Sequence, residues 1–183
     1  MDTKKTIALD MDEVIANVTP KFLDLYEESY GRRLKKADYW GKKIYQIEGA
    51  MEIRDRLFEK GFFRNLPVMP GSREGVRALM DDYEIFITTA AQEFRNCLED
   101  KYDWLQEHFP FIHWRNYVFC GDKGVLGTDY MIDDHARNLE GFRGKGLLFT
   151  ASHNIHEDRF TRVNNWTEIV DFFQEEQIKN LSV

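Results

Sequence analysis

Two pairs of acidic residues follow short apolar runs of the chain. Asp10 and Asp12 come directly after one run, and Asp133 and Asp134 end another. Carboxylates that pack together repel one another, so such a group calls for a divalent cation if the chain brings the pairs together. Ligands that offer only oxygen atoms favour a hard ion, and Mg²⁺ is the cofactor that we expect.

Hydroxyl and ammonium groups stand near the ends of other apolar runs. Thr88 and Thr89 follow residues 84–87, and Lys123 follows shortly after residues 117–120. A phosphoryl group needs a positive charge and hydrogen-bond donors beside its cation, so this set predicts phosphoryl transfer by positioning and electrostatics. A lone Thr-Thr more often caps a helix, and a lone Lys is usually solvated. The prediction therefore depends on all these groups meeting at one place.

The apolar runs are spaced like the strands of a parallel sheet. We expect strands at residues 6–9, 84–88, 117–120, 130–133 and 146–150, and helices at residues 20–30, 51–60, 72–80, 93–108 and 167–179. Short strands that alternate with helices predict an α/β fold, a doubly wound parallel sheet with helices on both faces. Ligands bind such sheets at the carboxyl ends of the strands, where the acids, threonines and lysine would converge.

Residues 17–70 do not follow this alternation. They carry charged and aromatic residues and helical patterns directly after the first strand. We therefore expect a small helical cap at 17–70, inserted into a catalytic core formed by residues 1–16 and 71–183.

The composition of the chain argues against some classes of binding partner. The 183 residues carry 25 basic and 32 acidic side chains, a net charge of −7, which argues against nucleic-acid polymers and anionic membranes as partners. The apolar runs are far too short to span a membrane, and the first residues lack the apolar core of a signal peptide. Two cysteines, Cys97 and Cys120, fit neither a disulfide framework nor a zinc motif. We expect a cytoplasmic protein, and the sequence leaves open whether it forms a homodimer.

The motifs resemble those of a known superfamily. Asp10-Met11-Asp12-Glu13-Val14, Ile85-Phe86-Ile87-Thr88, Lys123 and Ile132-Asp133-Asp134 are similar to the four motifs of the haloacid dehalogenase-like phosphatases. Nearly the whole chain is similar to the 5′(3′)-deoxyribonucleotidases within that superfamily. The segments that carry this closer likeness are Phe62-Phe63, Pro70-Gly71, Asp122-Lys123, 129–134 and 149–154.

The resemblance implies a role for each motif residue. Asp10 would be the nucleophile that forms an aspartyl-phosphate, and Asp12 the acid and base that serves the leaving oxygen and the water. Asp10, the backbone carbonyl of Asp12, and Asp134 would hold Mg²⁺, with Asp133 close behind. The phosphate would be bound by Thr88, Thr89 and Lys123.

The cap would supply the substrate pocket. Val18, Tyr39, Trp40 and Phe63 fall where the family lines its nucleoside site, and aromatic faces there would stack a base. The resemblance therefore implies a small-molecule nucleoside monophosphate as substrate. Glu13 stands where many relatives carry a small residue, which leaves the base preference open.

Three alternatives remain from the sequence. The first is a phosphatase of the same superfamily that acts on another small phosphorylated metabolite, the second a signalling receiver domain, and the third an inactive relative that only binds. Among the histidines, His153 and His156 resemble a metal pair only weakly, and His135 serves at most to orient Asp134. We expect His153 and His156 in a loop over the edge of the site or in a structural turn.

Overall fold

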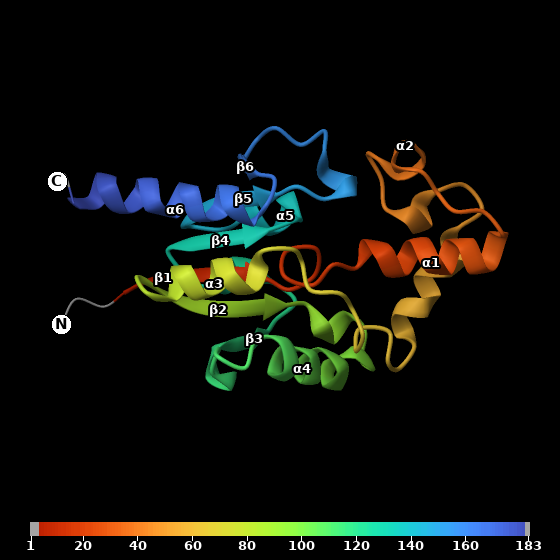
Figure 1. Ribbon diagram of the computed structural model, residues 1–183, viewed down its shortest axis with the longest axis horizontal. Helices are drawn as coiled ribbons and strands as arrows, with labels where there is room; N and C mark the ends of the chain where they lie inside the picture. The colour runs from red at the N-terminus through yellow and green to blue at the C-terminus, as the bar shows by residue number, and fades with distance from the viewer. Residues whose placement is uncertain (1–3, 182–183) are drawn as a thin grey trace.

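The computed structural model describes residues 4–181, and within them a parallel sheet of six strands forms the centre of the molecule (Figure 1). The strand order is β3-β2-β1-β4-β5-β6, and every neighbouring pair is parallel. The strands are β1 (Lys5–Asp10), β2 (Tyr83–Thr89), β3 (Tyr117–Phe119), β4 (Tyr130–Asp133), β5 (Lys145–Phe149) and β6 (Thr161–Val163). The α/β fold with a doubly wound parallel sheet, predicted from the sequence, is confirmed.

Helices cover both faces of the sheet because successive strand residues point to opposite sides. Ile7 and Leu9 belong to a large buried cluster with residues of α3 (Ser72–Met80), α4 (Cys97–His108) and α6 (Trp166–Leu181). Ala8, between them, belongs to a smaller cluster with Leu139 of α5 (Ala136–Glu140). The central strands β1 and β4 are buried from both sides along most of their length, which is why they read as continuous apolar runs.

Between β1 and α3 the chain forms a helical segment beyond the carboxyl ends of the strands (Figure 1). It contains α1 (Thr19–Tyr30), α2 (Lys36–Tyr39) and 3₁₀ turns at Ile44–Gln46 and Met51–Phe58. Gly31 ends α1 in the left-handed conformation, with φ 66° and its N–H bonded to the Glu27 carbonyl. This segment is the cap of our prediction; its division from the core at residues 17–70 stays a prediction.

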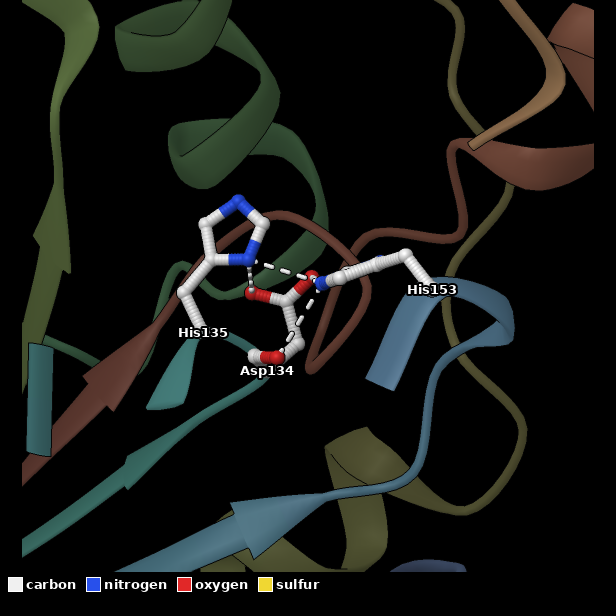
Figure 2. A group of neighbouring side chains, drawn as sticks. All are labelled: Asp134, His135 and His153. Atoms are coloured by element: carbon white, nitrogen blue, oxygen red, sulfur yellow. Dashed lines mark hydrogen bonds and ion pairs between the residues drawn. The ribbon is translucent and has the colours of Figure 1, made fainter. Parts of the chain in front are cut away.

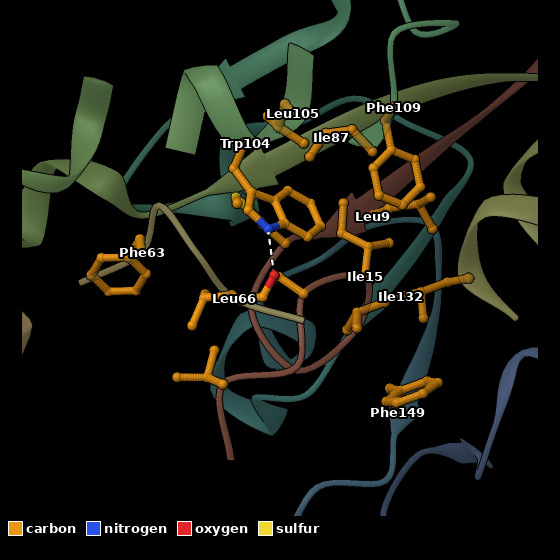
Figure 3. Close-up of a cluster of buried hydrophobic side chains, with 14 of the residues drawn as sticks. Leu9, Ile15, Phe63, Leu66, Ile87, Trp104, Leu105, Phe109, Ile132 and Phe149 are labelled. Atoms are coloured by element: carbon orange, nitrogen blue, oxygen red, sulfur yellow. Dashed lines mark hydrogen bonds between the residues drawn. The ribbon is translucent and has the colours of Figure 1, made fainter. Parts of the chain in front are cut away.

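Two short stretches of chain connect the cap to the sheet and run side by side. Asn17 donates its backbone N–H to the Pro67 carbonyl at 2.8 Å, and Met69 donates to the Ile15 carbonyl at 2.8 Å. The indole of Trp104, buried in α4, donates to the Leu66 carbonyl at 2.8 Å (Figure 3). The entry and the exit of the cap are therefore fixed against each other and against the core.

The structure departs from the sequence expectations in its shorter elements. The helix expected at 93–108 begins as α4 only at Cys97, after a 3₁₀ turn at Ala91–Glu93, and the helix expected at 51–60 consists of 3₁₀ turns. The elements α2, α5 and β6 were not expected, because three to five residues are too few to show a periodic pattern. Within residues 4–181, no helix combines the length and apolar character needed to cross a membrane.

Candidate active site

The sheet places the predicted catalytic groups at one edge. Asp10 and Thr88 are paired residues at the carboxyl ends of β1 and β2, and Asp133 ends β4, the other neighbour of β1. Thr88 is fully buried, and its hydroxyl donates to the Leu9 carbonyl at 3.2 Å. The convergence expected from strand ends is thus present in the fold.

Lys123 lies at the centre of the acids. Its ammonium group is 2.6 Å from Asp10 Oδ1 and 2.6 Å from Asp133 Oδ2, and its side chain is almost fully buried. Burial by itself lowers the pKa of Lys123, but the charges of Asp10 and Asp133 outweigh it and raise the pKa above its usual value. Lys123 therefore stays cationic beside the two carboxylates.

The remaining acid of this group, Asp134, has no lysine or arginine within ion-pair distance among the described residues. Burial, followed by the charge of Asp133, raises the pKa of Asp134 to about 8, and burial also raises the pKa of Asp10 well above its usual value. Oxygen atoms of Asp10, Asp133 and Asp134 lie within 4.8 Å of one another. The single ammonium of Lys123 cannot balance the charge of three ionised carboxylates, so the group favours the binding of a further cation. Ligands that are all oxygen atoms suit a hard divalent ion.

Asp12 has a partner that the sequence analysis did not find. Its Oδ2 accepts a hydrogen bond from Lys101 Nζ at 2.6 Å, and the same ammonium donates to Thr89 Oγ1 at 2.8 Å. Lys101 is 2% exposed, and its ammonium lies 4.4 Å from the centre of the Phe63 ring. Asp12 Oδ1 is buried with no hydrogen-bond partner among the described residues. Lys101 thus connects the Asp12 carboxylate, a predicted phosphate ligand and the cap.

Two histidines contact Asp134 (Figure 2). His153 Nε2 and His135 Nδ1 lie 3.5 Å and 3.9 Å from the Asp134 carboxylate and 2.7 Å from each other. Burial lowers the pKa of His135 to about 4 and that of His153 to about 3, so both rings are neutral at neutral pH. The hydrogen-bond partner of His153 is His135, and His153 itself lies in a 3₁₀ turn, Ser152–Asn154, after β5.

The acids line a cavity of about 300 Å³ between the core and the cap. Aromatic rings of the cap and of the loop after β2 also line this cavity: Phe22, Tyr45, Phe63 and Phe94. Val18 and Phe63 lie in the wall, as the sequence analysis expected. Tyr39 and Trp40 do not line this cavity, and their assignment to the substrate pocket stays a prediction. Trp40 is 38% exposed, with Lys36 Nζ 3.7 Å from its ring centre.

Comparison with solved structures identifies the fold. An L-2-haloacid dehalogenase aligns with a TM-score of 0.55 at 12% identity and covers 94% of this chain and 100% of that one. A defluorinating L-2-haloacid dehalogenase aligns with a TM-score of 0.52 at 11% identity and covers 93% and 95%. The fold is that of the haloacid dehalogenase-like hydrolases.

Residues 4–178 match the model of the family described as 5′ nucleotidase, deoxy (pyrimidine), cytosolic type C protein, and the chain belongs to this family. A 5′(3′)-deoxyribonucleotidase of Bacillus subtilis is 39% identical over 169 residues, 91% of this chain and 96% of that one. A Staphylococcus epidermidis protein that bears the same name in provisional form is 42% identical over 173 residues, 93% and 97% of the two chains. The protein is therefore an enzyme, a phosphatase of the nucleotidase type, which sets aside the receiver domain.

Proposed function

We propose that this enzyme hydrolyses deoxyribonucleoside monophosphates, with Mg²⁺ as cofactor and an aspartyl-phosphate on Asp10 as intermediate. The observation that carries the proposal is a single cavity lined by two chemically different sets of residues. Asp10, Lys123 and Asp134 of the core belong to the first set, and aromatic rings, most of them from the cap, form the second. A phosphate group suits the first set, and a flat base suits the second.

The protein groups at the phosphate end divide the reaction into two steps. The Asp10 carboxylate attacks the phosphorus atom, the bond to the sugar oxygen breaks, and that oxygen leaves with the proton of Asp12. Asp12 then takes a proton from water as the water attacks the aspartyl-phosphate, which releases phosphate and restores Asp10. Lys123 binds phosphate oxygens, and Lys101, which also donates to Thr89 Oγ1, orients the Asp12 carboxylate next to them. The Thr88 hydroxyl donates to the Leu9 carbonyl and would have to leave that bond to reach a phosphate oxygen.

The acids of the site fit a divalent cation. Asp10 and Asp134 are the ligands that we assign, together with the Asp12 backbone carbonyl, and Asp133 lies within the same group. When bound, Mg²⁺ neutralises charge on the phosphate oxygens and on the carboxylates. The oxygens of Asp133 also accept hydrogen bonds from Asn138 Nδ2 at 2.9 Å and 3.0 Å and from the His135 backbone N–H at 2.8 Å. Asp133 therefore mainly positions Lys123 and the loop after β4.

A phosphate-release assay with and without Mg²⁺ tests this function. The panel contains deoxyribonucleoside and ribonucleoside monophosphates, a sugar phosphate and acetyl phosphate. We expect the highest kcat/KM for a deoxyribonucleoside monophosphate and loss of activity in excess chelator. A clear preference for the sugar phosphate would overturn the substrate assignment, and full activity in chelator would overturn the metal assignment.

A further inference from the structure

Glu13 adopts a backbone conformation that an amino acid with a side chain rarely takes. Its φ is 63°, the left-handed region, and Glu13 is the one non-glycine residue with positive φ in the described part of the chain. The turn after Asp12 requires this conformation, because the Glu13 N–H donates to the Ala16 carbonyl at 2.7 Å. Glycine fits such a position without strain, so a glutamate there has a conformational cost. A side chain retained at a strained position beside a reactive site suggests a use for that side chain.

The Glu13 carboxylate lies where the loop that carries Asp10 and Asp12 meets the cap. It lines the cavity, and its two oxygens lie 3.1 Å and 3.2 Å from the hydroxyl of Thr19, the first residue of α1. Phe22, about one turn further along α1, lines the same cavity. Glu13 therefore connects the catalytic loop of the core with the helix that supplies one of the cap rings.

A nucleotide that spans the cavity has its sugar at the level of Glu13. The phosphate belongs beside Lys123 and the base among the cap rings, so the sugar must pass between them. A carboxylate offers about four lone-pair sites, and the hydroxyl and the backbone N–H of Thr19 fill only part of them. The remaining lone pairs can accept a hydrogen bond from a sugar hydroxyl, whereas a phosphate in the place of that hydroxyl brings acceptor oxygens and no donor.

We propose that Glu13 determines which sugar the site accepts: its carboxylate binds a free hydroxyl of the nucleotide sugar and rejects nucleotides that carry a second phosphate in its place. This inference rests on the proposed nucleotidase function and adds to it the part of the substrate that Glu13 recognises. It assigns Glu13 to specificity, separate from the chemistry of Asp10 and Asp12.

Three substrates and three variants test this assignment. The substrates are thymidine 5′-monophosphate, its analogue without the 3′-hydroxyl, and thymidine 3′,5′-bisphosphate. The variants are Glu13→Gly, Glu13→Gln and Thr19→Val, each checked for folding by circular dichroism. Glycine removes the side chain and relaxes the backbone, glutamine removes only the charge, and valine removes only the hydroxyl that holds Glu13.

In the wild-type enzyme we expect kcat/KM for thymidine 5′-monophosphate to exceed that for the deoxy analogue by about ten- to a hundredfold, the effect of a hydrogen bond to a charged group. Glu13→Gly should bring this ratio close to one. Glu13→Gln should keep part of the ratio, since its amide oxygen still accepts, and both Glu13 variants should raise activity on the bisphosphate. Thr19→Val should change the ratio less than Glu13→Gly does.

The competing explanation is that Glu13 only fastens the start of α1. In that case Glu13→Gly and Thr19→Val would lower activity on all three substrates by the same factor and leave the ratios unchanged, which would overturn the specificity role. Such a result with an active wild-type enzyme leaves the nucleotidase function standing. A wild-type enzyme that hydrolyses acetyl phosphate and none of the nucleotides would instead overturn the nucleotide substrate, and this inference with it.

Discussion

Asp10 lies at the end of the buried strand β1, with Lys123 2.6 Å away and other carboxylates nearby. Burial raises the pKa of Asp10, so the carboxylate stays ionised only if positive charges lie close to it. Lys123 supplies one such charge, and a bound cation would supply another. A carboxylate in this position can attack a phosphate only if it is ionised. The chemistry of this single residue therefore depends on the ammonium and the cation around it.

Replacement of Asp10 tests its role as nucleophile. Asp10→Asn keeps the shape of the side chain but removes the attacking oxygen anion, so turnover should fall by several orders of magnitude. The fold should survive, because the change also removes one charge from a repelling group. Steady-state phosphate release and circular dichroism measure the two effects. Retention of more than a few per cent of the rate would contradict the assignment.

Lys101 shows what the sequence does and does not reveal about a site residue. Its neighbours Glu99, Asp100 and Asp103 make the segment look like a solvated helix face. Yet Cys97, Lys101 and Trp104 stand at the spacing of one helical face, and all three are buried. A lysine on an apolar helix face is costly unless it is paired, and this signal could have pointed to it. The partner, Asp12, is 89 residues away, and only the fold brings the two together.

Loss of Lys101 should affect stability as well as rate. Lys101→Met leaves Asp12 without its partner, and breaking a buried pair costs about 3–5 kcal/mol. The Asp12 side chain is 33% exposed, so we expect a smaller loss, about 2 kcal/mol, in the free energy of unfolding. Urea denaturation measures it. Lys60→Met is the matched control, because Lys60 is 75% exposed in its ion pair with Glu99. Equal stability losses in both variants would contradict a special role for Lys101.

The cap is the element that decides which substrate fits, and its local structure was the hardest part to predict. Its 3₁₀ turns and the four-residue α2 lack the long periodicity that marks α3 or α6. The sequence indicated a cap because the strand–helix alternation stops, and two of the four pocket residues that it predicted, Val18 and Phe63, line the cavity. It could not separate Phe63 from Trp40, since the direction of an aromatic side chain depends on packing that only the folded cap provides.

Phe63 and Trp40 should therefore behave differently on substitution. Loss of a stacking ring costs roughly 1–3 kcal/mol of base binding, so Phe63→Leu should lower kcat/KM for a deoxyribonucleoside monophosphate by about ten- to a hundredfold. Leucine limits the cavity that alanine would leave in this buried position. Acetyl phosphate, which has no ring, is the control substrate. Trp40→Ala should leave the ratio between the two substrates unchanged, and equal ratios in both variants would contradict the assignment of Phe63 to the base.

At the scale of the whole molecule, the order of strands in the sheet predicts the place of the active site better than any single sequence motif does. Parallel strands with apolar sequences are recognised from the chain, and their carboxyl ends lie at one edge, so the meeting of Asp10, Thr88 and Asp133 follows from topology. The edge strand β6 and the helix α5 were not predicted, because each is too short to show a periodic pattern. The contact between His135 and His153 was not predicted either, because the two residues lie in loops after different strands.

The charge of the acids links metal binding to the stability of the molecule. The pKa of Asp134 is raised from 3.8 to about 8, so between these values the folded protein without metal binds more protons than the unfolded chain. The contribution of Asp134 to the free energy of unfolding should therefore fall as the pH rises from about 4 to about 8, while the lowered pKa values of His135 and His153 contribute in the opposite direction below about pH 6.5. A bound cation removes this penalty, so the rise in Tm caused by Mg²⁺ should increase from pH 5 to pH 8. Thermal melts in Mg²⁺ and in chelator measure it, and a shift that stays constant or shrinks would contradict a shared carboxylate site.

The covalent intermediate on Asp10 is the central claim, and its most direct test uses the Asp12→Asn variant with p-nitrophenyl phosphate and Mg²⁺. This substrate has a good leaving group, so the first step needs little help from an acid, whereas the attack of water lacks its base. We predict a burst of one p-nitrophenolate per enzyme molecule and, after an acid quench, a phosphoryl group that mass spectrometry locates on Asp10. Release of phosphate without a burst, with no phosphoryl group on Asp10 at any time, would contradict the account.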